Sequence, residues 1–339
     1  MHVTLQTVAE KAGVSASTAS RALAGSGGVS AETTERVLQI AKELGYVPRK
    51  YHRKTKKLQT KNVVVLSNRK HHLLNNPFYS QVVSGIESVL SEHGCQLVYK
   101  TLAGDETDDP AAVEAQVAEQ DGIILVGYEI DRELIRSISR RQVPFVLVDN
   151  DALDLHVNCV VNEDQAAAQR MVRHLIDLGH RRIAFLGGPA EHASFTQRYR
   201  GYLQALAEAG LDVDRDLVAF CSPRFRIDDG QRAAHELLTR ARLRPTALFA
   251  ANDGLAIGAV RAAQALGLDV PGDLSVAGFD DIEAARLITP PLTTVRVFKF
   301  EMGVEAGMRL IHIMRGTVNK PLKLVLPTEI VYRESTAKP

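Results

Sequence analysis

A run of basic side chains lies near the amino-terminal end of the chain. Seven Lys and Arg residues, and no acidic residue, occupy residues 49–61. Closely spaced cations of this kind can neutralise the phosphates of a nucleic acid, and such binding weakens as salt is added. The alternative is a solvated linker. The residues that precede the run favour contact with a nucleic acid.

Residues 4–23 have the pattern of two short helices. Thr4 and Ser15 are placed to cap them, and Gly13 allows the left-handed conformation that ends the first one. The apolar residues Leu5, Val8, Ala9 and Ala12 recur at helical spacing in the first helix. The inner face of the second helix consists of Thr18, Ala19 and Leu23. Two helices joined by a tight glycine turn form a helix-turn-helix unit, whose second helix enters the major groove of DNA. Taken alone, the pattern also fits an ordinary helical hairpin in a bundle.

A third helix completes a small headpiece. Ser30 caps it, and Gly45 and Pro48 end it. Its apolar stripe consists of Val37, Ile40, Ala41 and Leu44. We therefore expect a DNA-binding headpiece over residues 1–48 and a basic hinge over residues 49–61.

Composition and charge limit the class of protein. The 339 residues are 45% hydrophobic and 24% charged, with a net charge of +1. The first 58 residues hold ten Lys and Arg against four acids, so the rest of the chain is acidic. The three cysteines lie far apart, and we expect neither a disulfide framework nor a metal or other cofactor. The absence of a signal-peptide pattern and of a long apolar run favours a cytoplasmic protein.

From residue 62 onward, short apolar strands alternate with helices. The expected fold is an all-α helix-turn-helix headpiece followed by two α/β lobes, each a doubly wound parallel sheet. Ligands of such folds bind at the carboxyl ends of strands, here between the lobes. The pattern predicts helices over residues 111–119, 198–209 and 230–240 and a strand over residues 217–220. No GxGxxG, Walker loop, HExxH or Ser/His/Asp motif is found, so an enzyme is not expected.

The order of these parts resembles the LacI/GalR family of bacterial transcription regulators. The stretches that carry the resemblance are Val8–Ser15, Val29–Thr33, Leu178–Ile183, Ala251–Asp253, Gly278–Asp281 and Pro291–Thr294. The resemblance implies lobes similar to periplasmic sugar-binding proteins, joined by three crossovers. It divides residues 62–339 into a first lobe (62–160 plus 294–324) and a second lobe (162–292 plus 326–339).

The resemblance also implies which residues bind DNA. In the family, the start of the second helix contacts base edges, and the matching residues here are Ala16, Ser17 and Arg21. Arg21 can present two donors that match guanine O6 and N7. Phosphate contacts, which position without specifying, would come from Thr18, Ser20, Ser30 and Thr33; helix capping is the alternative role for these hydroxyls. The family binds pseudo-palindromic operators as dimers.

The hinge departs from the family pattern. Relatives usually have an Ala-rich helix with a Leu that wedges into the minor groove. Here Thr55 holds that position, beside Arg53 and Lys54, which we also expect to contact DNA. Either Leu58 serves in a shifted register, or the protein bends DNA less and relies more on charge.

Seven residues fall where members of the family contact their effector, and they are Phe78, Tyr79, Asp149, Arg198, Phe225, Asn252 and Asp280. Carboxylates, amides and guanidinium groups bind vicinal hydroxyls, and an aromatic face stacks on C–H groups. The partner would be a sugar or a sugar acid, although each carboxylate could instead be a structural ion-pair partner.

The function that follows is a dimeric repressor of carbohydrate-metabolism genes, whose operator affinity changes when the effector binds between the lobes. The sign of the response, as inducer or corepressor, stays open. The alternatives are a sugar-binding receptor, which would need a signal peptide and no headpiece, and an α/β enzyme without a role on DNA.

Overall fold

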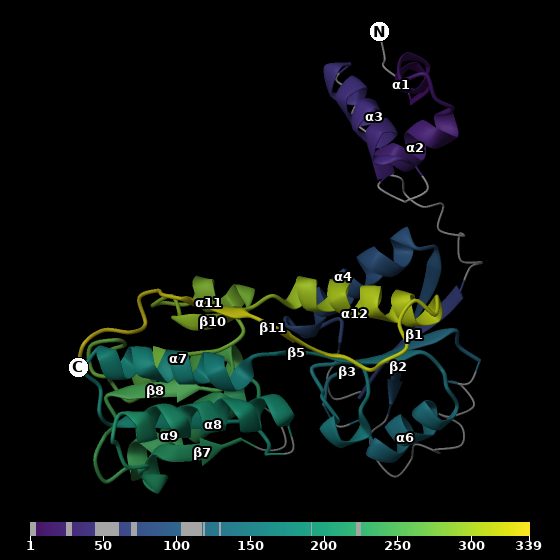
Figure 1. Ribbon diagram of the computed structural model, residues 1–339. Helices are drawn as coiled ribbons and strands as arrows, with labels where there is room; N and C mark the ends of the chain where they lie inside the picture. Colours follow the sequence, from purple (N-terminus) through teal and green to yellow (C-terminus); the bar gives the residue numbers. More distant parts are fainter. Residues whose placement is uncertain are drawn as a thin grey trace. The chain divides into compact units, whose positions relative to one another are not determined.

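The computed structural model describes residues 5–24, 29–44, 61–68, 73–102, 117, 119–128, 130–190, 192–221 and 225–339. The chain divides into two compact units, Met1–Lys57 and Leu58–Pro339. Figure 1 shows a small helical unit and a larger unit of sheets and helices.

The first unit consists of α1 (Leu5–Lys11), α2 (Ala16–Ala24) and α3 (Ala31–Glu43). Gly13, at φ +64°, makes the turn between α1 and α2, as the sequence predicts. The core is built from small apolar side chains, Val8, Ala9, Ala12, Ala19, Ala22, Val37 and Ala41. Because alanines fill little space, three short helices can approach closely and present one of them to a partner.

The first sheet of the larger unit has six parallel strands in the order β11-β5-β4-β3-β1-β2. These strands are β1 (Lys61–Asn68), β2 (Cys95–Leu102), β3 (Gly122–Val126), β4 (Phe145–Val148), β5 (Cys159–Asn162) and β11 (Lys323–Leu326). Both faces of the central strands are buried, which explains their continuous apolar runs. One face packs against α4 (Tyr79–Glu92) and α12 (Lys299–Met314), and the other against α6 (Arg132–Arg140), as Figure 1 shows.

The second sheet has four parallel strands in the order β7-β6-β8-β9. They are β6 (Ile183–Gly187), β7 (Val218–Phe220), β8 (Ala247–Ala250) and β9 (Ser275–Ala277). α7 (Asp164–Asp177) and α8 (Ala193–Glu208) cover one face, and α9 (Ile227–Arg240) and α10 (Asp253–Ala265) cover the other. The short helix α11 (Glu283–Leu287) contributes Ala285 to the apolar cluster on the face that α9 and α10 cover.

The chain passes between the two sheets at β5, which leads directly into α7. The antiparallel pair β10 (Thr294–Val297) and β12 (Thr328–Val331) follows the second sheet, and β11 lies between them in sequence but belongs to the first sheet. The expected headpiece with two doubly wound lobes is therefore confirmed. The exact limits assigned to each lobe stay predictions.

Several predicted elements differ in their bounds. The helix predicted to begin at residue 198 begins at Ala193, because the buried Phe195 extends its apolar stripe toward the amino terminus. The helix predicted from residue 230 begins at Ile227, where the Arg226 amide donates to Asp229. Leu217, predicted in a strand, ends a 3-10 turn over Arg215–Leu217. The helix predicted over residues 111–119 lies almost entirely outside the described residues.

Candidate DNA-binding and effector sites

The amino terminus of α2 is fixed by Ser15. Its hydroxyl accepts a hydrogen bond from the Thr18 amide at 3.1 Å and lies 2.8 Å from the Thr18 hydroxyl. The same arrangement recurs at α3, where Ser30 accepts from the Thr33 amide at 3.3 Å and donates to its hydroxyl at 2.8 Å. These serines therefore act as helix caps, and Thr18 and Thr33 are their partners. A phosphate contact by Thr18, Ser30 or Thr33 would come in addition to this structural role.

The exposed face of α2 carries Ser17 and Arg21, one helical turn apart, while Ala19 and Ala22 face the core. Arg21 Nε donates to the Ser17 carbonyl oxygen at 3.4 Å, so the guanidinium lies along the helix surface. Ala16 and Ser20 are half-buried at the border of this face. The geometry leaves Ser17 and Arg21 accessible to a groove, and the base-reading roles of these residues stay predictions.

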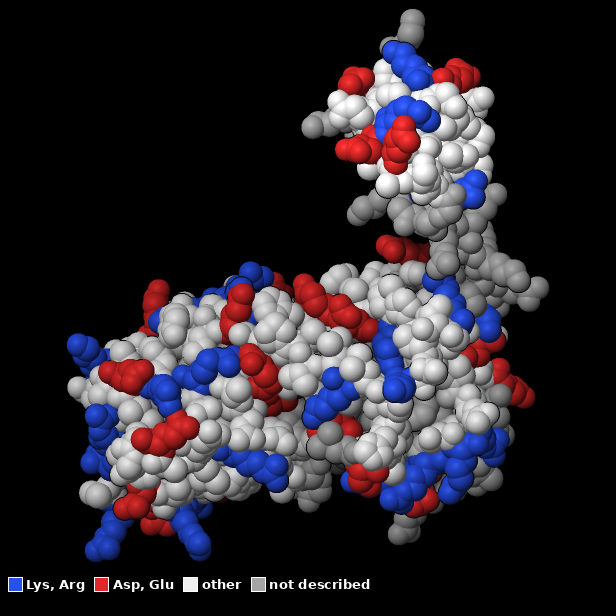
Figure 2. All heavy atoms as spheres, viewed as in Figure 1, with Lys and Arg blue, Asp and Glu red and all other residues white. Residues whose placement is uncertain are grey.

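The described helices of the first unit carry both signs of charge, as Figure 2 shows. Four basic and four acidic residues fall within residues 5–24 and 29–44. The positive excess of the amino-terminal part therefore comes from residues 49–57. Arg53, Lys54 and Thr55 lie in that segment, outside the described residues.

In the larger unit, Asp149 directly follows β4 and is held from both sides. The Tyr79 hydroxyl donates to Oδ2 at 2.8 Å, and the Ser194 hydroxyl donates to Oδ1 at 2.8 Å. Burial, with the neighbouring Asp149 charge, raises the pKa of Tyr79 well above its usual value, so the phenol stays a donor. Asp149 thereby links α4, which packs on the six-stranded sheet, to α8, which packs on the four-stranded sheet.

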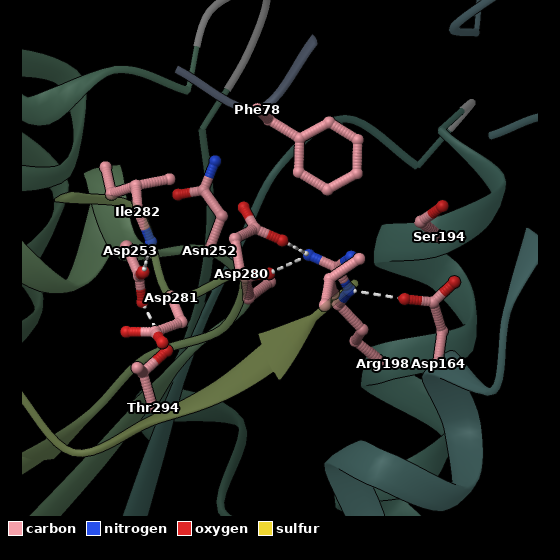
Figure 3. Close-up of polar contacts among 12 residues, drawn as sticks. Phe78, Asp164, Ser194, Arg198, Asn252, Asp253, Asp280, Asp281, Ile282 and Thr294 are labelled. Atoms are coloured by element: carbon pink, nitrogen blue, oxygen red, sulfur yellow. Dashed lines mark hydrogen bonds and ion pairs between the residues drawn. The ribbon is translucent and has the colours of Figure 1, made fainter. Parts of the chain in front are cut away.

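Arg198 projects from α8 into a buried ion network, drawn in Figure 3. Its Nε donates to Asp164 at 2.8 Å, and its Nη1 donates to Asp280 at 3.1 Å and to the Ala251 carbonyl at 2.6 Å. The guanidinium also stacks 3.7 Å from the centre of the Phe279 ring. Burial raises the pKa of both Asp164 and Asp280 to about 6, although the charge of Arg198 opposes this rise.

The backbone at the two central aspartates is unusual. Asp149 has φ +57° and Asp280 has φ +113°, a region that L residues rarely adopt. Such conformations cost free energy and cluster at functional sites. At Asp280 the ammonium of the buried Lys299 donates to the Asp280 carbonyl oxygen and, at 3.2 Å, to those of Asp281 and Val297. This anchoring holds the strained turn in place.

The remaining predicted effector residues surround the same region. Asn252 caps α10 by accepting from the Leu255 amide at 2.8 Å, and it donates to the Phe225 carbonyl at 3.4 Å. The Phe225 ring packs edge-on against Phe195, with ring centres 4.9 Å apart. In Figure 3, Phe78, Asn252, Asp280 and Arg198 point toward a common space. Asn252 thus has a clear structural role, and its contact with an effector stays a prediction.

Sequence reasoning missed Asp164, Ser194 and Lys299. Asp164 could have been found, because it is an acid two residues after a crossover strand, much as Asp149 directly follows β4. Ser194 and Lys299 could not, because only the folded chain brings them to Asp149 and Asp280. A cavity of about 270 Å³ opens beside this network, lined in part by Asp149, Asn162, Asp164, Ser194 and Lys323. Its size approaches that of pockets that bind small molecules.

The described residues contain no group of His, Cys, Asp and Glu side chains arranged to hold a metal ion. No helix in the described part of the chain is long and apolar enough to cross a membrane.

Comparison with known proteins identifies both units. Residues 4–49 match the family described as bacterial regulatory proteins, lacI family, and residues 172–336 match the periplasmic binding protein-like domain. The HTH-type transcriptional repressor CytR of Escherichia coli (strain K12) is 32% identical over 334 residues, covering 98% of this chain and 96% of CytR.

Two solved structures cover nearly the whole chain. The complex of the transcriptional regulator CelR with cellobiose has a TM-score of 0.75 and 33% identity, over 98% of this chain and 100% of that one. The lac repressor dimer bound to operator and the anti-inducer ONPF has a TM-score of 0.71 and 28% identity, over 99% and 100%.

Proposed function

The chain belongs to the LacI family of bacterial transcriptional regulators, and from this premise we propose that it is a repressor that binds a pseudo-palindromic operator as a dimer. The observation that carries the proposal is the helix-turn-helix headpiece, whose second helix exposes Ser17 and Arg21 beside a capped amino terminus. A dimer places two such helices on two half-sites, so operator symmetry follows protein symmetry.

A sugar-like effector bound between the two sheets controls operator affinity. The cluster of Asp149, Arg198 and Asp280 supports this, because carboxylates and a guanidinium group match hydroxyls in both donor and acceptor roles. The CelR complex contains cellobiose, which supports a carbohydrate as the class of ligand. The genes under control would then serve carbohydrate metabolism. Only a ligand that binds two lobe arrangements with different affinity can shift their populations.

Regulation of this kind requires binding and no turnover, so we propose that the protein is not an enzyme and requires no cofactor. The relatives compared above are transcriptional regulators. Because its target is chromosomal DNA, it would act in the cytoplasm. The basic segment that contains Arg53, Lys54 and Thr55 would add phosphate contacts and make the affinity salt-dependent.

The test begins with selection of bound duplexes from a random pool by the full-length protein. We expect the selected sequences to share a twofold-symmetric site. Binding to that site is then measured by fluorescence anisotropy with and without ribose, glucose, cellobiose and their acid derivatives. A sugar that changes operator affinity at least tenfold supports the proposal. Selection of no symmetric sequence, with and without these compounds, would reject it.

A further inference from the structure

Asn162 is the last residue of the crossover strand β5, and its amide has no hydrogen-bond partner among the described residues. Both Nδ2 and Oδ1 are buried, and the residue is only 5% exposed. A buried amide without partners costs free energy, so an amide left in this state needs an explanation. One such explanation is a ligand that forms hydrogen bonds with the amide when it is bound and leaves the amide without a partner when it is absent.

The two residues that follow Asn162 already have hydrogen-bond and ion-pair partners within the protein. Glu163 accepts from the Thr328 amide at 2.9 Å and pairs with Arg170. Asp164 pairs with Arg198 at 2.8 Å. Of three consecutive polar residues at the crossover, two hold the fold together, and Asn162 alone retains an open acceptor and an open donor group in the described structure.

The side chain of Asn162 faces the side of the sheet that carries the predicted effector residues. Side chains two positions apart on a strand point to the same face. Val160 packs in the cluster that contains Phe78, Tyr79 and Phe279, whereas Cys159 packs in the cluster on the opposite face. Asn162 therefore lies with Val160 on the face of the sheet that α4 covers, and it lines the same cavity as Asp149 and Ser194.

We propose that Asn162 is an effector-contacting residue, whose amide donates to one hydroxyl and accepts from the adjacent hydroxyl of a neutral sugar. This inference rests on the proposed function. A neutral ligand group is favoured here because the carboxylates that border the cavity, Asp149, Asp151, Glu163 and Asp164, outnumber the one bordering ammonium, that of Lys323, which pairs with Asp151. The negative balance repels an anionic group. The charged end of a sugar acid or sugar phosphate would have to bind elsewhere.

The variant Asn162→Leu tests this role through two measurements, the midpoint of thermal unfolding without ligand and the affinity for the sugar. Leucine has the same branching as asparagine without its polar atoms. Since the amide lacks partners in the free protein, we expect the midpoint of thermal unfolding without ligand to rise by about 2 to 4 °C. The affinity for the sugar should fall at least tenfold, because the hydroxyls lose their partner. Asn162→Ala, which adds no bulk, guards against a failure caused by overpacking.

Asn158→Leu is the matched control. Asn158 lies just before the same strand, but its side-chain oxygen accepts from Arg309 at 2.8 Å and from the Leu322 amide at 3.1 Å. Its replacement should lower the midpoint and leave sugar affinity unchanged.

Thermal shift is measured for wild type and the three variants without ligand and with ribose, glucose and cellobiose. A lowered ligand-free midpoint in both Asn162 variants, as in Asn158→Leu, would assign the amide a structural role and overturn the proposal. An unchanged sugar affinity in those variants would overturn it equally. If no sugar shifts the wild type, the sugar effector itself fails, and the role of Asn162 fails with it.

Discussion

Arg198 and Asp280 form a buried ion pair at 3.1 Å between residues 82 positions apart, and the same guanidinium pairs with Asp164 at 2.8 Å. One cation thus faces two carboxyl groups, and burial raises their pKa to about 6 even though the charge of Arg198 lowers it. A buried pair stabilises little relative to apolar residues, but removal of one partner leaves an uncompensated charge. The network is therefore sensitive to the loss of Arg198.

Arg198→Ala should lower the free energy of unfolding by about 3 to 5 kcal/mol at pH 7.5, because two buried carboxylates lose their cation. The loss should shrink at pH 5, where both carboxyl groups can take up a proton. Urea denaturation at the two pH values measures this. Arg200→Ala removes an exposed arginine of the same helix and should change stability by less than about 0.5 kcal/mol. An equal loss at both pH values would contradict the electrostatic explanation.

Asp253 predicts a pH dependence above neutrality. Burial, with the neighbouring Asp280 charge, raises its pKa to about 8. Since the unfolded value is about 3.9, the folded state holds an additional proton between these values, and stability falls as pH rises toward 8. The pKa values of His174 and His180 are lowered by burial, so both are neutral above pH 6.5. We therefore expect Asp253 to contribute a falling stability between pH 6.5 and 8.

Asp253→Asn should flatten the slope in this window, which can reach about 1.4 kcal/mol per pH unit in the wild type. Free energies of unfolding at pH 6.5, 7.2 and 8.0 provide the measurement. Asp281→Asn is the control, because Arg333 and Arg296 lower the pKa of Asp281 and its titration lies below the window. A slope that persists in Asp253→Asn, or is lost in the control, would assign the effect to another group.

Arg21→Ala should reduce discrimination between the selected operator and random DNA by about 1 to 3 kcal/mol, the value of one bidentate contact to guanine. Binding to random DNA should change little. Arg36→Ala removes an exposed charge from α3 and should weaken binding to both duplexes alike. Anisotropy titrations at fixed salt give the two affinities. An equal loss for both duplexes in Arg21→Ala would show that Arg21 contributes charge and reads no base.

The sequence predicts the fold well where periodicity and breakers agree. Gly13 and Ser15 define the turn and the cap of α2 by local chemistry alone, and both act as expected. The position of Asp149 at the end of β4 also follows from the strand pattern. These features depend on residues that are neighbours in sequence.

The partners of the site residues depend on contacts that no local pattern records. Ser194 reaches Asp149 across 45 positions, and Lys299 reaches the Asp280 carbonyl from a helix that the pattern did not suggest. The start of α8 was placed too late because Phe195 packs on Phe225, a contact made only in the folded chain. The partners of the site residues and the exact start of α8 therefore depend on tertiary packing, which the periodicity of the sequence does not predict.

The packing of α4 against α12 also depends on two glycines, and it yields a final prediction. A Cβ atom at Gly303 would lie 2.0 Å from the Val82 carbonyl oxygen, and one at Gly85 would lie 2.0 Å from that of Phe300. Backbone atoms cannot yield as a flexible side chain can. Gly303→Ala must therefore separate the two helices that cover one face of the six-stranded sheet.

Alanine normally favours a helix over glycine by about 1 kcal/mol. At Gly303 we expect the opposite sign, a net loss of about 2 kcal/mol in the free energy of unfolding, because overpacking exceeds the gain in propensity. Gly254→Ala is the control: it also lies in a helix, but its nearest contact would be an ordinary 3.4 Å, so stability should hold or rise. Urea denaturation of the two variants decides the matter. Equal stability of Gly303→Ala and wild type would mean that α4 and α12 lie further apart in solution.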